Sequence, residues 1–223
     1  MKKFNGFRTL SIILIGSTII FTSSCKEELK DIDGNVYKTV KIGDQLWMAE
    51  NLRVTKFNNG DPIETTNPAK LDISDLIEPK FQWVAGGNDS KLELYGRLYT
   101  WYVVTDSRKI CPEGWHVVTD TEWGNLCTMF GGKSKAGSSL KAVKNWAYSN
   151  SQSNNLSGFS ALPAGGRGAT GAFGGMEYYG GWWSTSSKDS LTAPYWNIYY
   201  ESETVKRAEY HKNAGFSVRC VKD

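Results

Sequence analysis

The alternation of apolar and polar residues predicts a β-hairpin in the first third of the chain. Residues 36–42 place Val, Val and Ile on one face of a period-two pattern, as in a half-buried strand. A Gly-Asp pair at 43–44 provides a turn, and the apolar residues 46–48 begin a return strand. We therefore expect two antiparallel strands joined by a tight turn.

Two later segments carry apolar residues at helical spacing. In LYGRLYTWYVV, residues 94–104, the spacing predicts a short amphipathic helix. In TDTEWGNLCTMFGG, Thr119 and Glu122 form a capping box, and the Gly-Gly pair at 131–132 ends the helix. The apolar face of this second helix includes Cys127.

The rest of the chain combines irregular loops with short strands. Residues 62–90 contain prolines and a Gly pair, and glycine pairs recur after residue 159. YWNIYY (195–200) and GFSVRCV (215–221) are typical of strands, and Glu201 with Glu203 is expected on an exposed strand face. The pattern predicts an α+β domain with two short helices in a loop-rich, mixed or antiparallel β framework.

The N-terminus has the pattern of a secretory signal. Residues 10–21 are almost wholly apolar and follow three cationic residues, but the run is shorter than the roughly 20 residues that span a bilayer. Small residues at 22–24 precede Cys25, which resembles a bacterial lipobox without its usual leucine. The alternative is a plain cleaved signal with an incidental cysteine. We expect a signal peptide over residues 1–24 and lipidation of Cys25.

The residues after Cys25 suggest a localisation signal. Lys26, Glu27 and Glu28 resemble the export signal of surface lipoproteins in the Bacteroidetes group, although charged runs are also common in solvated tethers. Two or three acyl chains hold a protein firmly on a membrane without a spanning helix. We expect a lipidated tether over residues 25–31, an anchor in outer-membrane lipid and an outward-facing domain from residue 32 to residue 223.

Charge and composition exclude some partners. Without residues 1–24 the chain has 23 basic and 23 acidic residues, so its formal net charge is zero. A neutral chain has no long-range attraction for nucleic acid. Nine Trp, eleven Tyr and 23 Gly favour a compact, loop-rich fold over a helical bundle.

The number of cysteines predicts one free thiol. If Cys25 carries lipid, Cys111, Cys127 and Cys220 remain, and an odd number leaves one of them unpaired. Cys127 is the candidate free thiol because it lies on the apolar face of the predicted helix, where a thiol behaves as a small hydrophobe.

Seven motifs together resemble the Fibrobacter succinogenes major paralogous domain, a family of secreted and lipid-anchored bacterial proteins. In chain order they are TVKIGDQLWMAENLR, NGDPI, YGRLYTWY, CPEGWHVVTDTEW, SGFSALPAGGR, GWWSTSS and GFSVRCVKD. More distantly, the layout is similar to the C-type-lectin-like fold of formylglycine-generating enzymes. This resemblance implies that the first and last strands pair, and that a disulfide joins Cys111 to Cys220.

The resemblance does not carry a catalytic or metal site with it. The similar enzymes use a cysteine pair for copper, whereas Cys220 is alone in its region, and related sulfoxide synthases need three histidines, whereas this chain has only His116 and His211. Calcium-binding lectins use Trp-Asn-Asp, but here Ile198 follows Trp-Asn. We expect no catalytic residues, no metal and no cofactor, and interpret His116 as a packed strand residue.

The candidate ligand contacts are aromatic. Trp182, Trp183, Tyr195 and Trp196 lie in the half of the chain that carries binding loops in the similar fold, and aromatic faces stack on sugars or anchor proteins. The alternative is that they fill the core, and in an extended Trp-Trp pair one ring can be buried and the other exposed. We expect a non-enzymatic domain that binds an extracellular glycan or protein. The alternatives are a structural or accessory subunit of a surface assembly and, less favoured, an enzyme.

Overall fold

The computed structural model describes residue 1 and residues 28–148 and 153–223. The lipidation site Cys25 and the export residues Lys26 and Glu27 lie outside the described residues. Glu28 is described, and its carboxylate pairs with the ammonium group of Lys30 at 3.2 Å. In the described part of the chain, no helix has both the length and the apolar character needed to cross a bilayer.

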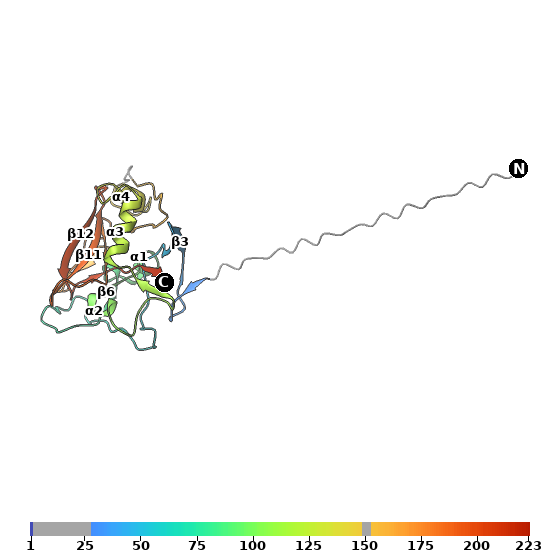
Figure 1. Ribbon diagram of the computed structural model, residues 1–223. Coiled ribbons are helices and arrows are strands. Elements are labelled where there is room, and N and C mark those ends of the chain that lie inside the picture. The colour runs from blue at the N-terminus through green and yellow to red at the C-terminus, as the bar shows by residue number, and fades with distance from the viewer. Residues whose placement is uncertain (2–27, 149–152) are drawn as a thin grey trace.

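The fold is of the α+β class, with antiparallel sheets and few short helices, as the sequence predicts (Figure 1). The first strand of the described residues lies before residue 32, where we expected the domain to start. Strand β1 (Leu29–Lys30) pairs with β2 (Val36–Tyr37), and the buried Asp31 accepts a 2.6 Å hydrogen bond from the Tyr37 hydroxyl. Part of the expected tether therefore belongs to the folded domain.

A four-stranded sheet joins the two ends of the domain. Its order is β3-β4-β14-β7. The strands are β3 (Thr39–Ile42), β4 (Gln45–Met48), β14 (Cys220–Lys222) and β7 (Trp115–Val117). The predicted hairpin is confirmed, because Ile42 lies opposite Gln45 across the two-residue turn. The last strand pairs with β4 of this hairpin, Val221 opposite Trp47, and not with β1.

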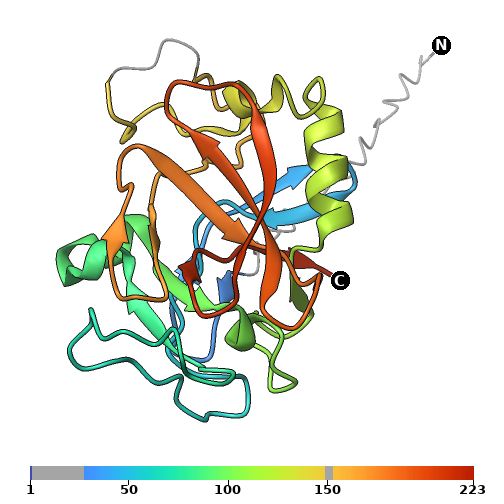
Figure 2. The ribbon, with the colours of Figure 1, turned by 90° about the vertical axis from the view of Figure 1, so that its left-hand side faces the viewer.

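A five-stranded sheet runs in the order β5-β6-β13-β8-β9. The strands are β5 (Gln82–Val84), β6 (Arg97–Thr100), β13 (Gly215–Phe216), β8 (Gly166–Arg167) and β9 (Phe173–Gly174). A three-stranded sheet contains β10 (Tyr179–Trp183), β11 (Thr192–Tyr199) and β12 (Val205–His211). Figure 2 shows this three-stranded sheet in front, with the blue strands of the first hairpin behind it.

The predicted helix over residues 94–104 is wrong. The segment divides into α1 (Leu92–Tyr95), strand β6 and α2 (Trp101–Val104). Gly96 interrupts it with φ of 72°, where an added Cβ would lie 2.8 Å from the carbonyl oxygen of Leu52. Because β6 lies between β5 and β13, ladder hydrogen bonds on both sides outweigh the helical spacing of its side chains.

The second predicted helix is confirmed as α3 (Asp120–Met129), with both halves of its capping box formed. The described residues contain further helices that the sequence did not reveal. These are α4 (Ala136–Leu140) and the 3₁₀ turns η1 (Ala85–Gly87) and η2 (Asp89–Lys91). Helix α4 is fixed from outside, since its Gly137 amide donates to the Glu203 carbonyl at 2.7 Å. Glu203 lies in the turn between β11 and β12 rather than on a strand, and so does Glu201.

The expected disulfide is present. Cys111 and Cys220 are bonded across a sequence separation of 109 residues, which ties the segment before β7 to the last strand. Cys127 is free and buried, as its place on α3 predicted. Burial raises the pKa of its thiol to about 11, so it remains protonated and inert at neutral pH.

Candidate functional site

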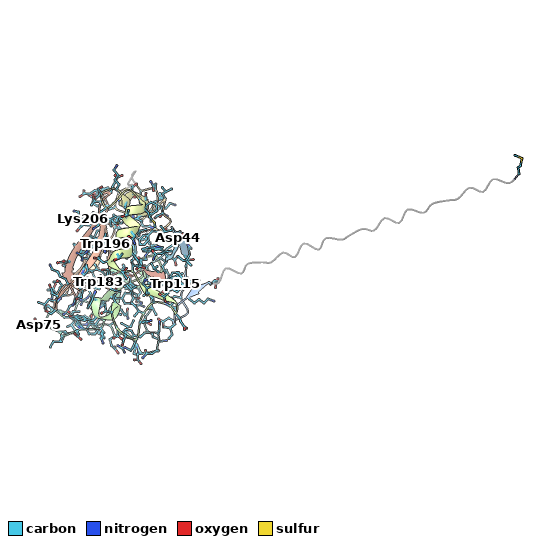
Figure 3. All side chains as sticks on the ribbon, in the orientation of Figure 1. Asp44, Asp75, Trp115, Trp183, Trp196 and Lys206 are labelled. Atoms are coloured by element: carbon cyan, nitrogen blue, oxygen red, sulfur yellow. A yellow bond between two sulfur atoms is a disulfide. The ribbon has the colours of Figure 1, made fainter. Side chains whose placement is uncertain are left out.

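Three of the four predicted ligand contacts are buried, so their prediction as contact residues is wrong. Trp182 and Trp183 are 0% exposed and Trp196 is 1% exposed. Figure 3 shows Trp183 and Trp196 inside the body of the molecule, while Lys206 lies at its outline. The idea that one ring of the Trp-Trp pair is exposed also fails.

The physical reason is that β10 and β11 pass between two hydrophobic cores. Trp182 and Trp196 face a cluster built around α3, whereas Trp183 faces the cluster that contains Phe216. Each of the three indole N–H groups has a hydrogen-bond acceptor, such as the buried Asn51 Oδ1 at 2.9 Å for Trp182. Alternation along a strand exposes one side chain in two only where one face meets solvent, and here both faces are covered.

Tyr195, the fourth candidate, lines a groove of about 440 Å³ between two sheets. Three more tyrosines from the three-stranded sheet share it, Tyr179, Tyr199 and Tyr210. Phe216 of β13 lies at its base. We call this the tyrosine groove. Its other wall is formed by Gly166, Arg167, Gly168, Thr170, Ala172, Gly174 and Gly175.

Strand register brings the four tyrosines to one face. Tyr195 and Tyr199 are four residues apart on β11 and therefore point the same way. Tyr179 lies opposite Tyr199, and Tyr210 lies opposite Ala193, which is on the same face of β11. A directly opposed pair shares a face, so β10, β11 and β12 each contribute to the groove.

The rings support one another. Tyr195 stacks on Phe216 with centroids 4.4 Å apart and planes 4° from parallel. Tyr179 contacts Tyr199 at 5.4 Å, and Tyr195 contacts Tyr210 at 5.9 Å. Tyr199 is 40% exposed and Tyr210 is 44% exposed. The groove is therefore an aromatic surface whose base is packed and whose rim is open to solvent.

Glycines allow the opposite wall to approach the rings. A Cβ on Gly166 would lie 2.6 Å from the Tyr179 hydroxyl, and one on Gly175 would lie 1.9 Å from the Tyr179 ring. Neither distance is sterically possible for a real side chain. The GGRG and FGG sequences, which the sequence alone showed only as glycine pairs, shape one side of the groove.

The hydroxyls of Tyr179 and Tyr195 remain neutral hydrogen-bonding groups. Burial raises the pKa of Tyr195 to about 12, and it also raises the pKa of Tyr179. Among the described residues of the lining, Arg167 is the charged one, and it is 1% exposed. Its guanidinium donates to the carbonyls of Ala69 and Gly168 and lies 4.0 Å from the centre of the Trp83 ring. Because those bonds already occupy it, the groove suits an uncharged polar ligand better than an ionic one.

The residues of a possible enzyme site are not gathered. His116 is half-buried on β7, with Nδ1 2.6 Å from Asp223 Oδ1 and Nε2 2.9 Å from Glu122 Oε1. Burial opposes its charge, but these two carboxylates outweigh burial and raise its pKa. His116 also borders a cleft of about 420 Å³ beside Cys111, yet both ring nitrogens already have partners. His116 is thus a paired strand residue.

The other candidates for chemistry lie elsewhere. His211 is on β12, where Nδ1 lies 3.2 Å from the Asn213 amide nitrogen, and Cys127 is enclosed in the core around α3. Within residues 28–148 and 153–223, no three His, Cys, Asp or Glu side chains form a group able to hold a metal ion.

Sequence reasoning missed Tyr179, Tyr199 and Tyr210. A partial signal was available, since Tyr195 and Tyr199 occupy alternate positions of YWNIY, which places them on one face of a strand. The residues that complete the groove come from β10 and β12 of the same sheet, and from β8, β9, β13 and the glycine-rich loop of a second sheet. Only strand pairing and the packing of the two sheets bring them together.

A family comparison matches most of the folded domain. The model of the Fibrobacter succinogenes major domain matches residues 40–222. The chain belongs to this family. Its matched region contains the whole tyrosine groove and the disulfide, while β1 and β2 precede it. Comparison with curated proteins and with solved structures gave no match.

Proposed function

We propose that this member of the Fibrobacter succinogenes major domain family is a lipid-anchored outer-membrane protein that binds an extracellular glycan without enzymatic activity. The observation that carries the proposal is the tyrosine groove, in which four tyrosines from three strands converge on one concavity.

The chemistry of the groove fits a sugar. Pyranose rings have apolar C–H faces that pack on aromatic rings, and hydroxyl rims that need hydrogen-bond partners. Tyrosine supplies both in one side chain. The groove volume of about 440 Å³ is in the usual range for small-ligand sites, and its lining has one charge, which is already bonded.

The connection of the two ends of the domain bears on the type of fold. We infer a C-type-lectin-like architecture from the pairing of the last strand with the first hairpin and from the Cys111–Cys220 bond to that strand. In this proposal sugar binding does not involve calcium, because the groove offers tyrosine hydroxyls and backbone groups rather than carboxylates.

The placement of the groove suits a protein attached through Cys25. Figures 1 and 2 show β11 and β12 on the side of the molecule opposite the strands near residue 29. A lipid anchor four residues before β1 would hold that side near the membrane. The tyrosine groove would then face away from the membrane, toward external ligands.

Binding to an array of bacterial, plant and host glycans tests the proposal directly. We expect the mature protein to bind a defined glycan, and Tyr199→Ala to weaken that binding at least about tenfold, because it removes an exposed ring without opening the core. Tyr102→Ala on α2 is the matched control and should bind as wild type. Binding that survives Tyr199→Ala together with Tyr210→Ala would place the site elsewhere, and no glycan binding at all would favour a structural role in a surface assembly.

Protease shaving of intact cells tests the anchor and its orientation. We expect the wild-type protein to be shaved, Cys25→Ala to be released from the membrane, and the triple alanine variant of residues 26–28 to stay membrane-bound but protected. Protection of the wild-type protein until cells are lysed would refute outward display.

A further inference from the structure

A second group of tyrosines lies just outside the groove. Tyr148 is 75% exposed and Tyr178 is 47% exposed. Both contact Tyr200, with ring centroids 5.8 Å and 5.5 Å away respectively. We call Tyr148, Tyr178 and Tyr200 the outer tyrosine cluster. Two large aromatic side chains with this much exposure in one cluster need an explanation, because scattered single exposed residues are the ordinary case.

The outer tyrosine cluster is continuous with the tyrosine groove through the backbone. Tyr178 directly precedes Tyr179, and Tyr200 directly follows Tyr199. The Tyr200 amide donates to the Tyr178 carbonyl at 2.8 Å, one step beyond the Tyr179–Tyr199 pair of the β10–β11 ladder. Successive side chains of a strand point to opposite faces. The groove and the cluster therefore occupy the two faces of the same strand ends.

The cluster is held in place from beneath. Lys141 is fully buried, and its ammonium group donates to the carbonyls of Tyr199 at 3.2 Å and Tyr200 at 2.8 Å. The same ammonium lies 5.3 Å from the centre of the Trp146 ring. Nearby, the Ala147 amide donates to the Glu177 carbonyl at 2.6 Å. A surface ordered before binding loses less entropy when a ligand arrives.

We propose that the outer tyrosine cluster is a second subsite for the groove ligand, and that this ligand is an oligosaccharide chain rather than a single sugar. The inference rests on the proposed function. One end of the chain occupies the tyrosine groove, and the following units pass around the ends of β10 and β11 onto Tyr178 and Tyr148. Both surfaces offer aromatic faces with hydroxyl rims, so both suit the same repeating ligand. A linked ligand gains affinity from the second surface because the second contact is intramolecular.

The test is the dependence of affinity on ligand length. Calorimetry would use the mature protein with cello-, xylo-, manno- and malto-oligosaccharides from the disaccharide to the hexasaccharide. In the series that binds, we expect wild-type affinity to rise at least about tenfold with length. Tyr178→Ala and Tyr148→Ala should lose most of this rise while binding the shortest ligand as wild type does. Both replace exposed rings, and Tyr102→Ala is the control.

The outcomes separate this inference from the proposed function. If affinity does not rise with length, or if Tyr178→Ala and Tyr148→Ala keep the full rise, the second subsite is refuted while groove binding stands. If these variants weaken every length equally, the cluster is not a separate subsite and the inference is again wrong. If no oligosaccharide binds and no glycan on the array is bound, both proposals are refuted.

Discussion

Replacing Lys141 by Met tests how the end of β11 is held. Lys141 is 0% exposed, and its ammonium group bonds to the carbonyls of Tyr199 and Tyr200. Among the described residues, no carboxylate lies within ion-pair distance of it. Burial lowers its pKa from 10.5 to about 8, against a smaller opposing effect of Glu203. Folding therefore buries a charge that water would otherwise stabilise.

The sign and size of the pH effect follow from linkage. Because the folded-state pKa is depressed, the unfolded chain binds more protons than the folded chain above about pH 8, so the free energy of unfolding rises with pH there. With pKa values of 10.5 and about 8, the gain from this one group between about pH 7 and about pH 10 is about 2 kcal/mol. The neutral amine that forms still donates to both carbonyls.

The assay is urea unfolding of the wild-type protein and of Lys141→Met at several pH values in this range. Other titrating groups, including the buried tyrosines, contribute equally to both proteins and cancel in the difference. Lys144→Met, which changes an exposed lysine three residues away, is the matched control and should show a flat difference. A difference for Lys141→Met that changes by less than about 0.5 kcal/mol would mean that the ammonium is solvated, and that it does not hold the strand end as described.

Two further predictions concern the links that close the domain. Replacing Cys111 and Cys220 together by Ala opens a loop with a sequence separation of 109 residues. In the chain-entropy account this lowers the free energy of unfolding by about 4–5 kcal/mol. Denaturant unfolding should show this loss, and a loss no larger than that of Cys127→Ala would contradict it. His116 has a raised folded-state pKa, so the stability it contributes is fully present below about pH 6.5 and is lost as pH rises through the folded-state value. The difference in free energy of unfolding between wild type and His116→Asn should therefore shrink from about pH 6 to about pH 9. A difference that grows over this range would show that the pKa shift has the opposite sign.

Local rules predicted the elements whose signals lie within a few residues. The turn at residues 43–44 and the capping box of Thr119 and Glu122 both formed as expected, because each depends on backbone conformations and hydrogen bonds of near neighbours. The free, buried state of Cys127 followed from the same helix periodicity. The Cys111–Cys220 bond was implied by the family resemblance, not by spacing.

Local rules failed where distant segments compete for the same residues. Residues 97–100 have helical spacing but form β6, since β5 and β13 pair with both of its edges. Alternation allows one ring of the Trp182-Trp183 pair to be exposed, yet both are buried, each in a separate core. Whether a strand face is covered depends on what packs against it, and no window of the sequence contains that information.

The sequence by itself determined the family, the α+β class, the first hairpin, the capped helix and the buried thiol. It also contains the predicted signal peptide and the predicted lipidation site at Cys25. Such signals are recognised as linear sequence, so they do not depend on the fold. The tertiary structure alone decided which aromatics are accessible. Tyr179, Tyr199 and Tyr210 meet because strand pairing joins residues distant in sequence, and the buried Arg219 is tolerated because the Asn51 side chain and three backbone carbonyls surround its guanidinium. Burial and convergence are properties of the assembled surface, since they depend on contacts that form only when the sheets pack.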